Sequence, residues 1–302
     1  MKLRKALEKA KKERGRETPL VSIKPHRKEI DQAGPEEARI SAPVRPKPKP
    51  DVPVAQDERP KGQAGWKPPV YSESRRFKFD RQKAAKNRCV SLFPESEEIE
   101  FYKILRTQIQ QRTKQQGWNT IMITSTQPGE GKTITSINLA VTMAKEFNQT
   151  VLLVDCDLRR QKIHDYLGLE NKRGLVDYLI DDKPLNDLIT WPNIPHMTLI
   201  SGGGIIREST ELLGSPKMKA LVHEMKARYD DRYVLFDVPP ILAGADATAF
   251  APLMDGVVMV VEAARTTKKD VKKALSLIPQ EKLIGVVLNK SRGPVKGYYK
   301  YY

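Results

Sequence analysis

The stretch TIMITSTQPGEGKT, residues 120–133, decides the fold. It begins with an apolar run of the kind that forms a buried strand, and the residues after Thr133 have helical spacing. Between them, Gly129 and Gly131 leave the backbone free of side chains, so its amide groups can approach an anion. Lys132 and Thr133 add a positive charge and a hydroxyl where the helix begins. The stretch predicts a strand, a phosphate-binding loop and a helix in direct succession.

The end of this stretch, Gly131-Lys132-Thr133, matches the end of a Walker A loop, although Thr126 stands where the first glycine is usual. In such a loop the lysine reaches the β- and γ-phosphates of ATP, and the hydroxyl binds Mg²⁺. We therefore expect ATP and Mg²⁺ as cofactors. The expected nucleotide contacts come from Gly129, Glu130, Gly131, Lys132, Thr133 and Ile134.

Acidic residues follow two other apolar runs. Asp155 and Asp157 come after residues 151–154, and Asp237 comes after residues 233–236, where a Walker B ligand of Mg²⁺ is required. Each acid alone could be an ordinary loop residue, but three at one sheet edge beside a Gly-Lys-Thr loop favour a site. Asn289 follows the last run, where its amide could read an adenine edge or simply occupy a turn.

Short apolar runs alternate with helical segments from about residue 96 onward. The runs are residues 120–124, 151–154, 197–200, 233–236, 257–261 and 283–288, and the helical segments are residues 97–116, 133–147, 215–229, 245–251 and 267–277. Continuous apolar strands separated by helices are typical of a parallel sheet covered on both faces. We expect an α/β fold, a doubly wound, mostly parallel sheet of the P-loop NTPase type, over residues 91–297.

Residues 1–90 have a different composition. They hold 25 Lys and Arg against 12 Asp and Glu, and 11 of the 22 prolines. Such a stretch predicts a disordered, basic, Pro-rich region. Three interpretations remain open: a solvated linker, attraction to an acidic membrane surface or a membrane-bound partner, and nonspecific contact with nucleic acid. No aromatic platform accompanies the charge, so we expect no specific nucleic-acid partner.

The composition of the whole chain excludes other classes. Mean hydropathy is −0.53 and no run of about 18 apolar residues exists, so a spanning helix and an apolar secretory signal are not expected. Two cysteines cannot form a disulfide framework, and no Cys/His cluster predicts zinc. We expect a cytoplasmic protein.

These motifs together resemble the bacterial tyrosine kinases (BY-kinases) of capsular and exopolysaccharide export, which belong to the deviant P-loop class of the MinD and ParA ATPases. The resemblance covers about residues 95–302. Residues 129–133 resemble the family's Walker A loop, residues 155–159 its Walker A′ motif and residues 236–240 its Walker B motif. The basic residues Lys268, Lys269, Lys272 and Lys273 resemble a family cluster near the active site, or form a solvated helix face.

Two further segments carry the resemblance. Residues 100–107 are similar to an E-x-x-R-x-x-R subunit-contact motif, with Glu100, Lys103 and Arg106 at its charged positions and lysine in place of one arginine. Residues 298–302 are similar to the family's C-terminal tyrosine cluster, which implies that Tyr298, Tyr299, Tyr301 and Tyr302 accept phosphate. A C-terminal strand or an interface patch is the alternative for this segment.

The resemblance implies a tyrosine autokinase. Lys132, Asp155, Asp157 and Asp237 would be catalytic, with Thr133, Asp155 and Asp237 at the metal and Asp155 accepting the proton of the incoming tyrosine. The implied partners are further copies of the chain in a ring, a separate membrane modulator of the polysaccharide co-polymerase kind, and a cognate tyrosine phosphatase. The implied location is the inner face of the cell membrane, reached through that modulator.

Two other functions share the expected fold. A MinD- or ParA-like positioning ATPase would hydrolyse ATP, but the signature lysine of that class is replaced by Gln127 and its C-terminal amphipathic helix is missing. A scaffold that binds nucleotide as a switch would perform no chemistry. Phosphotyrosine formation distinguishes the kinase from both.

Overall fold

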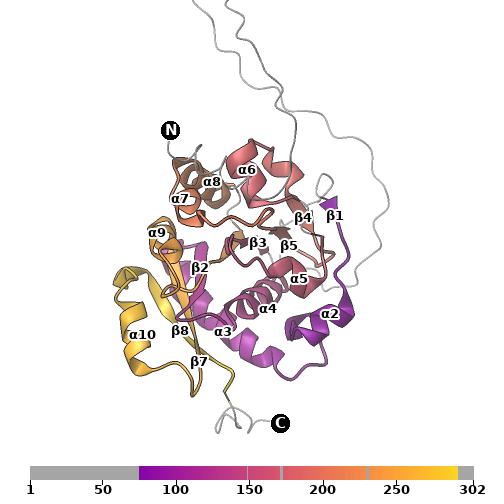
Figure 1. Ribbon diagram of the computed structural model, residues 1–302. Helices are drawn as coiled ribbons and strands as arrows, with labels where there is room; N and C mark the ends of the chain where they lie inside the picture. Colours follow the sequence, from indigo (N-terminus) through magenta and orange to yellow (C-terminus); the bar gives the residue numbers. More distant parts are fainter. Residues whose placement is uncertain (1–74, 148, 171–172, 229–230, 292–302) are drawn as a thin grey trace, which may run out of the picture.

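The computed structural model describes residues 75–147, 149–170, 173–228 and 231–291. Within these ranges the chain forms one eight-stranded sheet in the order β1-β4-β5-β3-β6-β2-β7-β8 (Figure 1). The strands are β1 (Arg75–Arg76), β2 (Thr120–Ser125), β3 (Thr150–Asp155), β4 (Ile189–Trp191), β5 (Met197–Ile200), β6 (Arg232–Asp237), β7 (Gly256–Glu262) and β8 (Leu283–Asn289). Every neighbouring pair is parallel except β4 and β5. The predicted doubly wound, mostly parallel α/β fold is confirmed.

Helices cover both faces of the sheet because successive strand residues point to opposite sides. In β2, Ile121 and Ile123 join one buried cluster and Met122 joins the other. The first cluster includes residues of α2 (Arg81–Lys86), α3 (Ile99–Thr113), α4 (Lys132–Ala144) and α5 (Ile163–Leu167). The second includes residues of α6 (Leu175–Asp181), α7 (Ser209–Leu213), α8 (Pro216–Ala227), α9 (Asp246–Phe250) and α10 (Lys268–Leu275).

All six apolar runs form strands and all five helical segments form helices, with ends shifted by a few residues. The sequence pattern missed α2, α5, α6, α7 and the short strands β1 and β4. These elements have between two and seven residues each, too few for a hydrophobic period to be visible.

Residues 75–93 extend the folded unit to the N-terminal side of residue 91. The Asp80 side chain caps α2 by accepting from two backbone amides, and the Asp80 N–H donates to the Leu167 carbonyl of α5 at 2.8 Å. Ser91 is tied to α4, since its N–H donates to the Asn138 side chain at 2.8 Å. The basic residues just before residue 91 therefore include packed structure. The expected disorder of residues 1–74 lies outside the described residues.

In the described part of the chain, no helix combines the length and apolar character needed to cross a membrane.

The sheet order brings the functional motifs together. Strand β6 lies between β2 and β3, and all three run parallel, so their carboxyl ends meet at one edge. The phosphate-binding loop leaves β2 there, while Asp155 ends β3 and Asp237 ends β6 as register partners. Ligands bind at this edge in open α/β sheets.

Candidate active site

The phosphate-binding loop joins β2 to α4. Gly129 and Gly131 have φ angles of 86° and 95°. Residues with a Cβ atom rarely adopt this backbone conformation, whereas glycine does so readily. A Cβ at Gly131 would also lie 2.1 Å from the side-chain nitrogen of Asn289. Thr126 does not have a positive φ. The position of the usual first glycine therefore accepts a threonine here because its backbone needs no glycine.

Two polar side chains hold the loop in shape. The buried Glu130 carboxylate accepts from the Gln127 N–H at 2.8 Å and from the Thr266 hydroxyl. The Asn289 amide nitrogen donates to the Glu130 carbonyl at 2.9 Å. Both residues are thus engaged with the loop itself in this structure, while Ile134 lines the neighbouring cavity. Contact of Asn289 with an adenine ring stays a prediction.

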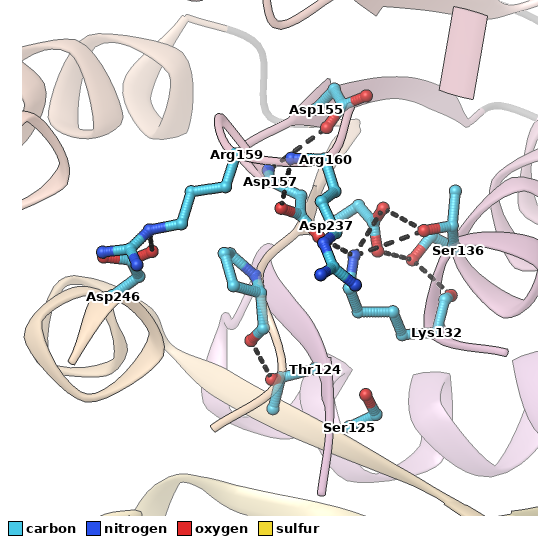
Figure 2. Close-up of polar contacts among 12 residues, drawn as sticks. Thr124, Ser125, Lys132, Ser136, Asp155, Asp157, Arg159, Arg160, Asp237 and Asp246 are labelled. Atoms are coloured by element: carbon cyan, nitrogen blue, oxygen red, sulfur yellow. Dashed lines mark hydrogen bonds and ion pairs between the residues drawn. The ribbon is translucent and has the colours of Figure 1, made fainter. Parts of the chain in front are cut away.

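A buried charge cluster lies where α4 begins (Figure 2). The Lys132 ammonium is 2.9 Å from an Asp157 carboxylate oxygen and 3.2 Å from Asp237 Oδ2. The Thr133 hydroxyl donates to the same Asp237 oxygen at 2.6 Å. The structure therefore brings together the carboxyl end of β6, the first turn of α4 and the loop after β3, as the sequence predicted.

Asp155 lies at the back of the cluster. Its two carboxylate oxygens accept from the backbone N–H groups of Asp157 and Ile163, each at 3.2 Å. Burial, together with the nearby Asp237 charge, raises the pKa of Asp155 to about 8. Burial likewise raises the pKa of Asp237, with Lys132 and the Thr133 hydroxyl opposing the shift. Burial alone would lower the pKa of Lys132, but the charges of Asp237 and Asp157 outweigh it and raise that pKa.

A cavity of about 330 Å³ opens over this cluster. Its lining comes from the phosphate-binding loop, the loop after β3, α5 and the segment after β6, and comprises Pro128, Gly129, Gly131, Lys132, Thr133, Ile134, Asp157, Arg159, Arg160, Lys162, Tyr166, Pro239, Pro240, Ala243, Gly244 and Asp246. Asp157 is therefore the acid of the cluster that faces the cavity, whereas Asp155 and Asp237 lie behind the lining.

The donor chemistry at the cluster suits a hard cation that is partly held by phosphate. In the described residues, no group of three His, Cys, Asp or Glu side chains is arranged to hold a metal alone. Mg²⁺ is commonly held by one or two carboxylates together with substrate phosphates and water. The adjacent Thr133 hydroxyl and Asp237 carboxylate fit that pattern.

Sequence reasoning missed two contributors. The buried Ser136 hydroxyl lies one helical turn after Lys132 and contacts Asp237 Oδ1 at 3.1 Å. That spacing of four residues was a usable signal. Asp246, on α9, pairs with Arg159 at 2.9 Å and accepts from Ser209 at 2.7 Å. No local pattern predicts this network, because its members come from three distant segments.

The expected subunit-contact residues lie on α3. Lys103 pairs with Glu100 at 2.6 Å, one turn apart on the same exposed helix face. Arg106 instead turns toward α4, where it pairs with Glu146 at 2.6 Å and donates to the Thr142 carbonyl at 3.2 Å. Contact with another subunit stays a prediction for all three expected residues.

Two other predicted groups lie away from the charge cluster or outside the described residues. The four lysines of the expected basic cluster are all exposed: Lys268 opens α10 and Lys269, Lys272 and Lys273 follow. The expected phosphoacceptors Tyr298, Tyr299, Tyr301 and Tyr302 lie outside the described residues.

Comparison with known proteins gives concordant matches. Residues 118–283 match the family model described as an AAA domain. The chain is 36% identical over 211 residues to the tyrosine-protein kinase YwqD of Bacillus subtilis (strain 168), covering 69% of this chain and 88% of that protein. It is 32% identical over 205 residues to the tyrosine-protein kinase CpsD of Streptococcus agalactiae, covering 67% and 87%. The kinase domain of the Escherichia coli tyrosine kinase ETK aligns with a TM-score of 0.65 and 26% identity, covering 78% of this chain and 95% of that chain.

Proposed function

This chain belongs to the bacterial tyrosine-protein kinases, and from that premise we propose that it transfers the γ-phosphate of ATP to Tyr298, Tyr299, Tyr301 and Tyr302 of a neighbouring copy. The proposal includes the organisation expected from the sequence: a basic N-terminal region, a kinase domain that ends near residue 297, and a short acceptor tail. The process served would be the polymerisation and export of capsular polysaccharide or exopolysaccharide.

One observation carries the proposal. The Lys132 ammonium is held between Asp157 and Asp237 at the base of a cavity that the glycine loop borders. Phosphoryl transfer asks a protein mainly for positioning and charge neutralisation. A lysine, backbone amide groups and a hydroxyl at a helix start supply both for a triphosphate.

The same residues define how the cofactors would be held. The loop amides and Lys132 would bind the β- and γ-phosphates, and Thr133 and Asp237 would hold Mg²⁺, with Asp155 near it. Bound Mg²⁺ supplies neutralisation of phosphate charge. Ser136 and Asp157 position Asp237 and Lys132 through the contacts at 3.1 Å and 2.9 Å.

The transfer step needs a base for the acceptor. The tyrosine O–H proton passes to a carboxylate, the phenolic oxygen forms a bond to the γ-phosphorus, and the bond from that phosphorus to the bridging oxygen breaks to leave ADP. We assign the base role to Asp155, because a bound cation beside it would favour the ionised carboxylate, which is the form that can take the proton. Asp157, which faces the cavity, assists with geometry and the metal.

The test is incubation of the purified chain with ATP and Mg²⁺, with phosphotyrosine and released phosphate both measured. We expect phosphotyrosine confined to residues 298–302 and lost when all four tyrosines become phenylalanine. Phosphate release without phosphotyrosine would instead identify a positioning ATPase, and neither product would identify a nucleotide-binding scaffold. Comparison of Asp155→Asn with Asp157→Asn assigns the base, because only the base variant should lose the pH dependence of the transfer rate.

Assembly brings one copy's tail to another copy's site. We propose a ring in which α3 forms the subunit contact through Glu100, Lys103 and Arg106. Each phosphorylated tyrosine gains about −1.5 to −2 charges, so repulsion among tails and against the carboxylates of the charge cluster loosens the ring. Sedimentation of the chain before and after incubation with ATP tests this, with a fall in mass expected.

The membrane association is proposed to be indirect. A separate modulator of the polysaccharide co-polymerase kind holds the chain at the inner membrane face. The basic residues 1–90 add electrostatic attraction to anionic lipid. A cognate tyrosine phosphatase, the third proposed partner, removes the phosphate from the tyrosines. Binding to vesicles containing phosphatidylserine, with and without residues 1–74, tests the lipid contribution. Unchanged binding after that deletion would remove residues 1–74 from the proposal.

A further inference from the structure

The cavity over the charge cluster is lined by four basic residues. Three of them are neutralised by a carboxylate: Lys132 pairs with Asp157 at 2.9 Å, Arg159 with Asp246 at 2.9 Å and Lys162 with Asp165 at 2.7 Å. Arg160 is the exception, since its guanidinium has no ion pair or hydrogen bond with any described residue. Three cations of the cavity lining are thus already paired, and Arg160 is the fourth, without a partner among the described residues.

The backbone of Arg160 is fixed although its side chain is exposed. Its N–H donates to the Asp157 carboxylate at 3.0 Å and to the Asp157 carbonyl at 3.0 Å, which closes a turn directly after the acid. The same carboxylate uses its other oxygen to pair with Lys132. Asp157 therefore contacts both residues, through the side chain of Lys132 and the backbone N–H of Arg160, and fixes their positions relative to each other.

The Arg160 side chain extends toward the buried charge cluster. In Figure 2 the Arg160 side chain runs past Asp157 toward the end of Lys132, and both residues line the same cavity. Because Lys132 is already paired with Asp157 and Asp237, the Arg160 guanidinium is the charge left to meet an anion that enters the cavity. A phosphoryl group held by the loop would occupy that space.

We propose that Arg160 is a catalytic residue that contacts the γ-phosphoryl group during transfer. The inference rests on the proposed function. In the transition state, negative charge spreads over the three equatorial oxygens while the bridging bond breaks and the bond to the acceptor oxygen forms. The planar guanidinium offers two parallel N–H donors to such oxygens, an arrangement that a lysine ammonium does not provide. Arg160 thus stabilises the moving group, whereas Lys132 holds it before and after.

The experiment compares the full-length wild-type chain with Arg160→Gln and Arg160→Lys. Turnover is counted as phosphotyrosine plus released phosphate at saturating ATP and Mg²⁺. We expect Arg160→Gln to lower kcat by at least about 100-fold with little change in the KM for ATP, because the contact forms in the transition state. Arg160→Lys should retain part of the rate, since it keeps the positive charge but loses the two parallel N–H donors of the guanidinium. Arg228→Gln, at the C-cap directly after α8, removes an exposed pair with Glu224; it is the matched control and should keep wild-type turnover.

A second measurement does not depend on the acceptor. Affinity for ADP alone and for ADP with Mg²⁺ and fluoroaluminate is measured by titration calorimetry for each variant. Arg160→Gln should retain ADP binding and lose the additional affinity for the fluoroaluminate complex. A wild-type chain that only releases phosphate would refute the kinase assignment while leaving the Arg160 comparison intact. Wild-type kcat in Arg160→Gln, a change in KM alone, or undiminished fluoroaluminate affinity would each overturn the role of Arg160.

Discussion

Two lysines in this molecule make ion pairs of nearly equal length in opposite surroundings. Lys132 lies 2.9 Å from Asp157 with 9% of its side chain exposed, and Lys103 lies 2.6 Å from Glu100 with 45% exposed. Arg106 is intermediate, at 2.6 Å from Glu146 and 17% exposed. An exposed pair contributes between nothing and about 1 kcal/mol, whereas breaking a buried pair costs about 3–5 kcal/mol. Burial, rather than distance, therefore decides which of these cations is indispensable.

We expect the largest effect at Lys132, the more deeply buried of the two lysines. Lys132→Met should reduce ATP-dependent phosphotyrosine by at least about 100-fold, because a charge aimed at the phosphates is removed from a buried position. Immunoblotting for phosphotyrosine measures it. The matched control is Lys219→Met, which makes the same chemical change at an exposed position of α8 and should keep most of the activity. A Lys132→Met protein that labels itself at the wild-type rate would show that Lys132 and its buried charge cluster do not carry the activity.

The second prediction concerns Asp155 in the protein freed of metal by EDTA. Its pKa in the folded chain is about 8, above the ordinary 3.8, so the folded state holds a proton that the unfolded state releases between these values. Stability from this group is fully present below about pH 4 and is lost as pH rises toward 8, by up to about 1.4 kcal/mol per pH unit. Urea unfolding at pH 5, 6.5 and 8 should show this loss in the wild type and a smaller one in Asp155→Asn. Equal slopes would mean that Asp155 is ionised throughout.

The intermediate case is Arg106. Arg106→Ala removes the pair with Glu146 and the hydrogen bond to the Thr142 carbonyl, both partly buried. We expect a loss of about 1 kcal/mol in the free energy of unfolding, measured by urea denaturation of the full chain. Sedimentation of the same variant separates the two roles of this residue. A smaller assembly with unchanged stability would assign Arg106 to the proposed subunit contact, and a loss of stability alone would assign it to the contacts within the chain.

The smallest effect on stability is expected at Lys103, the more exposed of the two lysines. Lys103→Ala should change the free energy of unfolding by no more than about 0.5 kcal/mol, because its partner Glu100 lies one turn away in water. Thermal unfolding at low and high salt is the measurement, and salt should remove most of the difference. A loss above 1 kcal/mol would show that this pair is shielded from solvent by another copy of the chain.

The order of the strands was partly hidden in the sequence. Six apolar runs and the glycine loop predict a parallel sheet with a phosphate site at its carboxyl edge, since continuous apolar strands must be covered on both faces. The antiparallel strand β4 has only Ile189–Trp191 and no visible period. Residues 75–90 were expected to belong to a disordered region because of their charge, but Ala84 is fully buried against the domain.

The candidate site divides in the same way. Lys132, Thr133 and the three acids are recognisable because each follows a strand or begins a helix at a motif position. The roles of Ser136 and Arg159 depend on partners more than 80 residues away in sequence, at Asp237 and Asp246. Their contacts exist only once β6 and α9 are in place.

What the sequence determined by itself was local: a glycine loop between a strand and a helix, acids directly after two other apolar runs, and a tail rich in tyrosine. These follow from backbone freedom, hydrophobic period and charge, which are properties of short segments. Only the tertiary structure decided that Asp157 faces the cavity while Asp155 lies behind it, and that Arg106 pairs within its own chain. Those outcomes depend on which side chains the packed helices bury, and burial is a property of the whole fold.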